Sequence, residues 1–305
     1  MVKLLNIGNT CAINSLLQSI NCCKINIELF DKPKDNTFTK ALFELLHLMQ
    51  IYNEKTIKPT NFLKLLYSNF IYFRPREQLD SQEVWTLLSN KVFQETSESI
   101  NNNKSFTSDI HQKAYVEISK HNNNKTSLWN DLFQGVLLQI LICNNCNHKK
   151  YMFETFYSLS INLSTTIVKS LQEYFEKVLT DEIDCEHCKQ KHKQTKFLKL
   201  YKLPKFLVIS LNRYNNLGQK ILSKIDVNTN IILSNNILYE NKKNIELKLL
   251  SQINHFGNIN SGHYNAVDNK NNIVIDDDSE FEFDKEKLKE NCNVYMLFYH
   301  TNFVI

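Results

Sequence analysis

A cysteine at position 11 stands where a helix is expected to begin. Gly8, Asn9 and Thr10 precede Cys11, and the apolar residues that follow recur at the spacing of one helical face: Ile13, Leu16, Leu17 and Ile20. The unpaired N–H groups and positive dipole end of a helix N-terminus favour a thiolate, the form of cysteine that attacks a carbonyl carbon. The same segment also fits a buried structural cysteine beside a helix cap, so this segment alone does not show that Cys11 is a nucleophile.

A base for this nucleophile is available near the other end of the chain. His263 follows Gly262 and opens a predicted strand over residues 263–267. A second short strand is predicted at residues 272–276, after a polar, turn-rich connection. An imidazole held between a thiol and a carboxylate would complete the triad arrangement of a cysteine protease.

The acid of such a triad depends on the register of these two strands. With Asn269 and Lys270 as a two-residue turn, His263 lies opposite Asp276, at about 5 Å between Cβ atoms. Asp277 then points to the other face, and a slip of one residue would exchange the two, so Asp277 is the alternative acid. Taken alone, the segment is better explained by a structural histidine followed by a solvated acidic turn.

Four further cysteines form two Cys-x-x-Cys pairs, one on each side of residues 147–184: Cys143, Cys146, Cys185 and Cys188. Two such pairs between strand-like segments predict a closed, structural Zn²⁺ site with four thiolate ligands. The alternative is four unrelated buried cysteines. The neighbouring histidines are read as bystanders, and the three remaining cysteines as core packing: His148, His187 and His192, then Cys22, Cys23 and Cys292.

The predicted elements that must position these groups divide the chain into a helical part and a part rich in strands. The first hundred residues read as helices, in particular residues 42–49, 62–70 and 82–93. Residues 97–104 and 121–127 read as surface loops around a short strand, residues 114–118. From residue 132 onward, runs rich in β-branched and aromatic residues predict a sheet. With no repeat and no Pro-rich linker, a single composite domain is expected.

Composition excludes several broad classes. The net charge of +4 over 305 residues gives no electrostatic case for a dedicated nucleic-acid or membrane-surface binder, and the basic run from Lys189 to Lys205 is read as a solvated hairpin. No signal peptide or membrane span is evident, so we expect an intracellular protein of the cytoplasm or nucleus, not a secreted one. The cysteines are then thiols or metal ligands rather than disulfides.

Taken together, the segments resemble the ubiquitin-specific protease family, in order and across nearly the whole chain. NIGNTCAINSLLQS is similar to the family's cysteine box, and INHFGNINSGHYNAVD with NNIVIDDDS is similar to its histidine box. QLDSQE, LFQGVLLQILICNNC, ETFYSLSINL, LPKFLVISLNRY and VYMLFYH stand where the family has similar strings. Some positions depart from the family pattern without removing a catalytic group: Ala12, Val84, Trp85 and Ile275.

The resemblance implies an α+β, papain-like cysteine protease fold with a helical thumb, an antiparallel palm sheet and zinc-bearing β fingers. One catalytic domain would fill residues 1–305, with the thumb at 1–105, fingers and part of the palm at 130–210, the palm at 211–305, and 97–127 partly a loop insertion. Asn6 would stabilise the oxyanion. The residues implied to bind substrate are Gln78, Asp80, Glu83, Gly262 and Tyr264.

The expected function is hydrolysis of the bond after the C-terminal glycine of ubiquitin, by a Cys11–His263–Asp276 triad. Ubiquitin and ubiquitinated proteins are the expected partners, with no nucleic acid, no membrane and a monomeric state. Three other readings stay open: an isopeptidase for another ubiquitin-like modifier, a catalytically weak ubiquitin-binding relative, and a zinc-ribbon nucleic-acid binder. The last is suggested by the two Cys-x-x-Cys pairs and the basic run.

Overall fold

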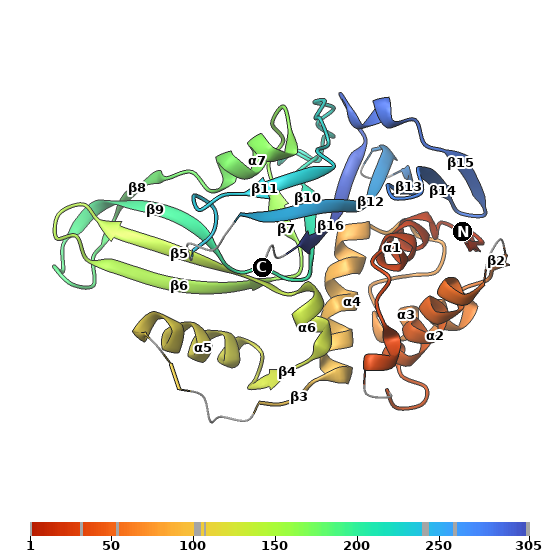
Figure 1. Ribbon diagram of the computed structural model, residues 1–305, viewed down its shortest axis with the longest axis horizontal. Coiled ribbons are helices and arrows are strands. Elements are labelled where there is room, and N and C mark those ends of the chain that lie inside the picture. Colours follow the sequence, from red (N-terminus) through yellow and green to blue (C-terminus); the bar gives the residue numbers. More distant parts are fainter. Residues whose placement is uncertain are drawn as a thin grey trace.

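The computed structural model describes residues 2–30, 33–52, 55–100, 105–106, 108–239, 244–258 and 261–302 (Figure 1). In this part of the chain, no helix is long and apolar enough to cross a membrane. Ile259 and Asn260, within the histidine-box motif, and part of the predicted 97–127 insertion lie outside the described residues.

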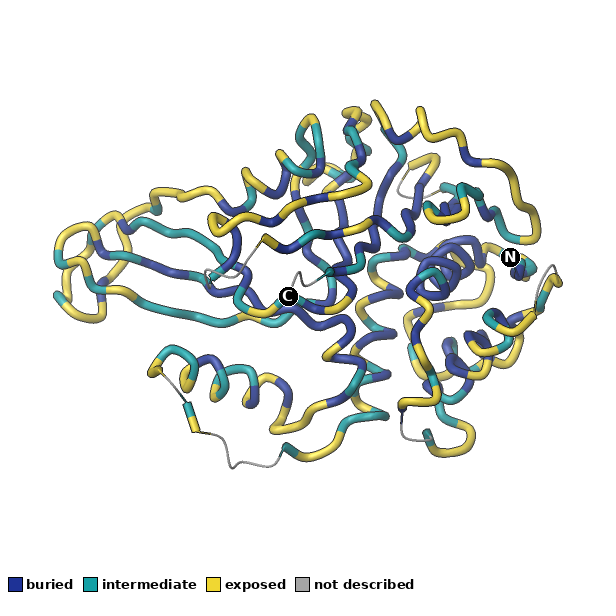
Figure 2. The backbone as a smooth tube through the Cα atoms, in the orientation of Figure 1, coloured by how far each residue is buried: buried dark blue, intermediate teal, exposed yellow. Residues whose placement is uncertain are grey.

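Four helices form a bundle from the first third of the chain, called the thumb below. They are α1 (Cys11–Cys22), α2 (Phe38–Ile51), α3 (Thr60–Asn69) and α4 (Ser81–Thr96), joined by the short helix η1 (Ile27–Leu29) and the two-strand pair β1 (Lys3–Leu4) and β2 (Thr56–Ile57). The predicted stripe of α1 is buried, but so are the polar residues Asn14, Gln18 and Ser19. Since α1 is covered on nearly all sides, it is a central helix (Figure 2).

The palm is an eight-stranded sheet on which α1 packs. Its strands are β7 (Leu159–Ile161), β10 (Phe206–Leu211), β11 (Asn230–Leu233), β12 (Ile245–Gly257), β13 (Gly262–Asp268), β14 (Ile273–Asp276), β15 (Ser279–Glu282) and β16 (Val294–Asn302). The order is β15-β14-β13-β12-β16-β10-β7, and β11 pairs with β12. One hydrophobic cluster includes residues of both thumb and palm, so the two parts share a core.

A second sheet of four long strands, the fingers, extends from the palm (Figure 1). It contains β5 (Gly135–Cys143), β6 (Lys149–Phe156), β8 (Val178–Asp184) and β9 (Lys191–Lys202) in the order β6-β5-β9-β8. The predicted basic run falls mostly on β9. Helix α6 (Leu128–Phe133) leads into this sheet, α7 (Ile167–Tyr174) lies beside it, and η2 (Lys285–Leu288) precedes β16.

The structure corrects the expectation for residues 114–118. These residues belong to helix α5 (Asp109–His121), between the short paired strands β3 (Glu98–Ser99) and β4 (Lys125–Thr126). The run Ala-Tyr-Val-Glu-Ile is rich in strand-forming residue types, but Ala114 is buried while Val116 is more than half exposed, and α5 packs on β6. Tertiary packing therefore overrides the local preference for a strand.

The predicted turn between β13 and β14 is also wrong. The strands pair Ala266 with Ile275 and Asp268 with Ile273, so the connection is four residues long, residues 269–272, instead of two. Cys22 and Cys292, predicted as core residues, are only half-buried. The helical first third and the sheet-rich remainder are confirmed, while the thumb, fingers and palm boundaries given above stay predictions.

Candidate active site

His263 and Asp276 are in direct contact at the end of the β13–β14 hairpin. Nε2 of His263 lies 2.5 Å from Oδ1 of Asp276. The true register is displaced by two residues from the predicted one, so the two are diagonal rather than opposite. A displacement of two keeps every side chain on its face, because the side-chain period of a strand is two. For this reason the two residues meet even though the turn was misjudged.

Cys11 is the first residue of α1 and is buried, and α1 packs on β13, the strand that carries His263. A hydrogen bond with Cys11 is the largest influence on His263 and raises its pKa to about 9; burial opposes the shift, and Asp276 adds to it. Because Asp276 occupies Nε2, Nδ1 is the ring nitrogen left for the sulfur. At neutral pH the imidazole is therefore held as the cation.

Asn6 is fixed in orientation by the loop that precedes the helix. Its Oδ1 accepts hydrogen bonds from the backbone N–H of Gly8 (3.0 Å) and of Thr10 (3.1 Å). The oxygen must therefore face the loop, which turns Nδ2 outward, where it donates to Oδ2 of Asp277 at 2.8 Å. An amide nitrogen carries two hydrogens, so one donor remains for a ligand near the helix N-terminus.

Asp277 joins the palm to the thumb. Its Oδ1 accepts a hydrogen bond from Nδ2 of Asn14 at 2.8 Å, its Oδ2 binds Asn6, and its carbonyl accepts from the N–H of Leu4 at 3.1 Å. Its backbone is left-handed, with φ +51°, in the turn between β14 and β15. Asp277 lies near His263, with side-chain polar atoms of both and of Asp276 within 4.8 Å of one another. Both of its carboxylate oxygens nevertheless accept hydrogen bonds from Asn6 and Asn14, and neither bonds to His263.

Asn14 was missed by sequence reasoning. It lies one turn after Cys11 on α1 and is almost fully buried, where an amide needs a partner. The signal in the sequence was only weak, because Asn14 is one of several polar residues of α1, although it lies next to the proposed nucleophile. Its partner Asp277 could not have been identified without the register of a distant hairpin.

Gln78 bridges the thumb and the residue before His263. Its Nε2 donates to the carbonyl of Gly262 at 2.9 Å, and its Oε1 accepts from the N–H of Gly262 at 2.7 Å. The side-chain amide thus imitates a paired strand. A Cβ on Gly262 would lie 2.2 Å from Nε2 of His255, so only glycine fits this close approach.

The other predicted substrate-binding residues divide into buried and exposed groups. Asp80 caps α4 by accepting from the N–H of Gln82 (2.8 Å) and Glu83 (3.1 Å). Its second oxygen accepts from the hydroxyls of Tyr295 (2.7 Å) and Tyr264 (3.3 Å). Tyr264 is only 7% exposed, so it bonds to Asp80 from the protein interior. The side chain of Glu83, in contrast, is exposed.

The four paired cysteines meet at the far end of the fingers, with all sulfurs within 4.8 Å of one another. Both pairs have the same knuckle geometry. In each, the first cysteine's N–H and C=O bond back across the turn, and the residue four positions later, Asn147 or Lys189, has a left-handed backbone.

The sulfur separations fit a metal site. Cys143 and Cys188 are 4.0 Å apart at Sγ, and Cys146 and Cys185 are 3.6 Å apart. Tetrahedral Zn²⁺ with sulfur ligands at about 2.3 Å places the sulfurs roughly 3.8 Å from one another. The cluster can therefore hold a metal ion. His148 and His187 stack on each other nearby, and their rings lie outside the cluster.

Comparison with known proteins agrees with this geometry. The family model for ubiquitin carboxyl-terminal hydrolase matches residues 2–299. The chain belongs to the ubiquitin carboxyl-terminal hydrolase family. It is 24% identical over 285 residues to ubiquitin carboxyl-terminal hydrolase Usp2 of Drosophila melanogaster, covering 86% of this chain and 30% of that protein. It is 29% identical over 168 residues to ubiquitin carboxyl-terminal hydrolase 23 of Arabidopsis thaliana, covering 52% of this chain and 19% of that one.

Among solved structures, the chain is similar to one in the SAGA Ubp8/Sgf11/Sus1/Sgf73 DUB module bound to ubiquitin aldehyde. The TM-score is 0.73 at 21% identity, covering 99% of this chain and 70% of that chain. The predicted α+β fold with thumb, palm and fingers is thereby confirmed for this member of the family. The chain spans less than a third of the fly relative's length.

Proposed function

We propose that this chain is a thiol-dependent deubiquitinase that hydrolyses the bond after the C-terminal glycine of ubiquitin. One observation carries the proposal: His263 bonds to Asp276, and its pKa is raised chiefly by Cys11, although the three come from separate parts of the chain. Membership of the ubiquitin carboxyl-terminal hydrolase family supports ubiquitin as the substrate.

In the proposed reaction, the Cys11 thiolate attacks the carbonyl carbon of the terminal glycine. The His263 imidazolium gives its proton to the departing lysine amine, and a thioester forms between Cys11 and ubiquitin. The neutral imidazole then takes a proton from water, which attacks the thioester and releases the ubiquitin carboxylate and the Cys11 thiolate. Asp276 keeps the ring oriented and its cation stabilised throughout.

We propose that the oxyanion accepts hydrogen bonds from the N–H of the Asn6 amide that Asp277 does not use and from backbone N–H groups at the start of α1. In this assignment Asp277 is a positioning residue and not the triad acid. Its bond to Nδ2 stops the Asn6 amide from rotating, and its bond to Asn14 ties the same carboxylate to the nucleophile helix.

The extended tail of ubiquitin would enter between Gln78 and Glu83 of the thumb and Gly262 of the palm. The exposed carboxylate of Glu83 suits a basic tail residue, and the backbone of Gly262 offers a donor and an acceptor once the Gln78 amide moves aside. Asp80 and Tyr264 would act indirectly, because their polar groups bond to each other.

For the fingers we propose one structural Zn²⁺ held by Cys143, Cys146, Cys185 and Cys188. Backbone N–H groups of Cys188 and His187 lower the pKa of Cys185 to about 6, which suits a thiolate ligand. Four thiolate ligands and a free nucleophilic thiol require reducing conditions, so we place the protein inside the cell, in the cytoplasm or nucleus. A monomer stays a prediction; the similar solved chain lies in a multi-subunit module.

The test is release of a fluorophore from the C-terminus of ubiquitin by the purified chain. Cys11→Ala is expected to abolish release, since no other group supplies the nucleophile. Cys22→Ala is the matched control, because Cys22 is half-buried at the other end of the same helix and should leave activity unchanged.

Reactive probes made from ubiquitin and from other ubiquitin-like modifiers complete the test. Labelling of Cys11 by the ubiquitin probe alone is expected. Preferential labelling by another modifier would reassign the substrate, and no labelling by any probe would identify a non-catalytic relative. Activity retained in Cys11→Ala would refute the mechanism.

A further inference from the structure

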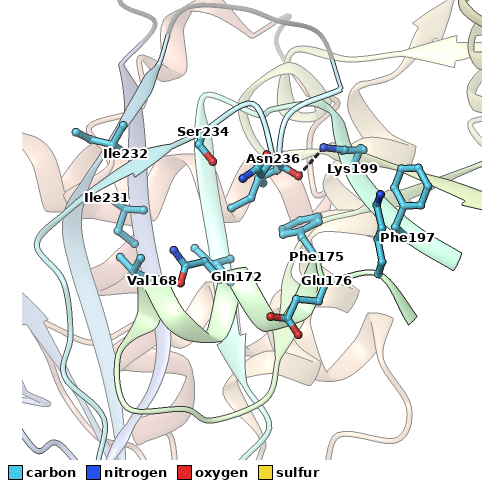
Figure 3. A pocket seen from close by; sticks show the side chains of 13 residues that line it. Val168, Gln172, Phe175, Glu176, Phe197, Lys199, Ile231, Ile232, Ser234 and Asn236 are labelled. Carbon is cyan, nitrogen blue, oxygen red and sulfur yellow. Dashed lines mark hydrogen bonds between the residues drawn. The ribbon is translucent and has the colours of Figure 1, made fainter. Parts of the chain in front are cut away.

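A hollow of about 620 Å³ lies between α7, β9 and β11 (Figure 3). Its apolar lining includes Phe175 and Phe197, with Ile231, Ile232 and Ile237 from the β11 region. None of the proposed catalytic, tail-binding or metal-binding residues contributes to it. The volume is within the range of sites that bind ligands or anchor residues of partner proteins.

One wall of this hollow is the open edge of β11. This strand pairs with β12 only, among the residues that the structure describes. The bond from the N–H of Leu249 to the carbonyl of Thr229 sets the alternation, so Ile231 and Leu233 direct their backbone groups to β12. The N–H and C=O of Asn230 and Ile232 consequently face the other edge.

The lining supports an edge that is open to the hollow. Ile231 is 2% exposed and Ile232 is 65% exposed, so their side chains lie on opposite faces of the strand. Both nevertheless contribute to the same hollow. A cavity that meets both faces of a strand lies along its edge, where an added strand would find backbone partners.

Two lysines give this groove a positive charge. Nζ of Lys177 lies 5.5 Å from the ring centre of Phe197. Nζ of Lys199 donates to the carbonyls of Asn235 (3.0 Å) and Asn236 (2.5 Å), which leaves its charge without an anion. Burial and the charge of Lys177 lower the pKa of Lys199.

One carboxylate, that of Glu176, also lines the hollow. In the described part of the chain neither lysine forms an ion pair, and Glu176 turns its carboxylate away from Lys199 in Figure 3. A bound anionic group would therefore relieve the repulsion between two ammonium groups.

We propose that this groove binds an extended, acidic segment of a partner protein as an additional strand on β11. Backbone groups of the segment pair with Asn230 and Ile232, an apolar side chain enters the space beside Phe175 and Ile237, and an Asp or Glu carboxylate lies between Lys177 and Lys199. The proposal is independent of the chemistry at Cys11. It gives a role to Lys199, one residue of the basic run on β9.

The experiment selects peptides from a phage-displayed random library on the intact chain and measures the fluorescein-labelled synthetic peptides by anisotropy. Acidic sequences that contain an apolar residue are expected. Gln172→Trp, on the exposed side of α7, fills the groove and is expected to abolish binding. Lys177→Glu should weaken it at least about tenfold through loss of a charge-assisted contact, and Lys193→Glu, on β9 outside the groove, is the matched control.

Ile232→Pro tests the added strand itself. It removes an N–H that β12 does not use, which an edge strand tolerates, and it should weaken binding as strongly as Lys177→Glu, while Ile232→Val should not. Thermal melting checks that each variant is folded.

Three results would overturn the proposal: no acidic peptide enriched by the selection, binding that survives Gln172→Trp, or equal losses in Lys177→Glu and Lys193→Glu. The last result, with competition by a single-stranded oligonucleotide, would identify a general basic patch.

Discussion

At the residue scale, the protonation of His263 controls when the site can work. The hydrogen bond with Cys11 and the neighbouring Asp276 raise its pKa to about 9 from an ordinary 6.5. A raised pKa in the folded state stabilises the fold fully below about pH 6.5 and loses that contribution as pH rises through about 9. The imidazolium that protonates the leaving amine in the proposed reaction disappears over the same interval.

We therefore predict that kcat/KM for a ubiquitin C-terminal amide falls as pH rises through about 9. The measurement is a pH–rate profile of the purified chain. Asp276→Asn should move this fall to lower pH, because the carboxylate is one of the groups that hold the proton on the ring. A rate that keeps rising beyond pH 10, about one unit above that value, would contradict the ion-pair description.

The two adjacent aspartates should separate kinetically. Asp277→Ala is expected to lower kcat by about tenfold to a hundredfold, somewhat less than the roughly 10²–10³ lost on removing an oxyanion donor. Its pH profile should stay in place, since Asp277 is not among the groups that raise the pKa of His263. Asp276→Ala should shift the profile. The assignment fails if Asp277→Ala shifts the profile and Asp276→Ala does not.

The candidate site was partly accessible from sequence at this scale. The types and order of Cys11, His263 and Asp276 suffice to propose a triad, and alternation along a strand chooses between the two aspartates despite the wrong turn. The hydrogen bonds of Asp277 to Asn6 and Asn14 could not be predicted from the sequence, because they depend on how a hairpin turn packs against a helix far away in the sequence.

At the scale of elements, the fingers depend on the cysteine cluster at their far end. Strand β8 is almost entirely exposed, so apolar burial contributes little to holding it there (Figure 2). The Cys-x-x-Cys knuckles are the groups that close this end, and a metal ion that joins them would supply most of the local stability.

We predict that Cys185→Ser opens the fingers without disabling the nucleophile. Trypsin should cleave rapidly within residues 143–193, and the KM for ubiquitin conjugates should rise, because in the proposed function we expect the fingers to contact the body of ubiquitin. Alkylation of Cys11 by iodoacetamide should proceed at the wild-type rate. Cys292→Ser, at a half-buried position outside the cluster, is the control. Wild-type trypsin resistance and zinc content in Cys185→Ser would exclude the proposed zinc site.

Element prediction succeeded for elements that are buried on most sides and failed for α5, which is buried on one side only. The apolar stripe of α1 and the apolar runs of β5, β10 and β16 indicate by themselves a buried helix or buried strands. Helix α5 carries strand-forming residue types, and its helical state depends on its packing against β6, which no local pattern reveals.

At the scale of the whole molecule, the thumb and palm form one cooperative unit. Trp85 of α4 is fully buried, donates to the carbonyl of Tyr157 at 2.9 Å, and packs against Phe133 and against Phe298 of the palm. The cleft proposed for catalysis is therefore built on a shared core and does not lie between independent domains.

We predict that Trp85→Ala lowers the free energy of unfolding by about 3–5 kcal/mol while thumb and palm still unfold in a single transition. Calorimetry and hydrogen exchange of the palm strands would measure both effects. Trp85→Phe, which keeps most of the ring, should cost less. Two separate transitions would show that thumb and palm are distinct folding units.

The separation of Cys11 from His263 and Asp277 along the chain has a consequence for biosynthesis. The ribosome makes the sulfur of Cys11 first, and it makes the imidazole of His263 and the carboxylate of Asp277 more than 250 residues later. A nascent polypeptide that has not reached His263 thus lacks the base of the proposed triad, and premature chemistry on neighbouring nascent proteins is avoided until translation of this chain has passed these residues.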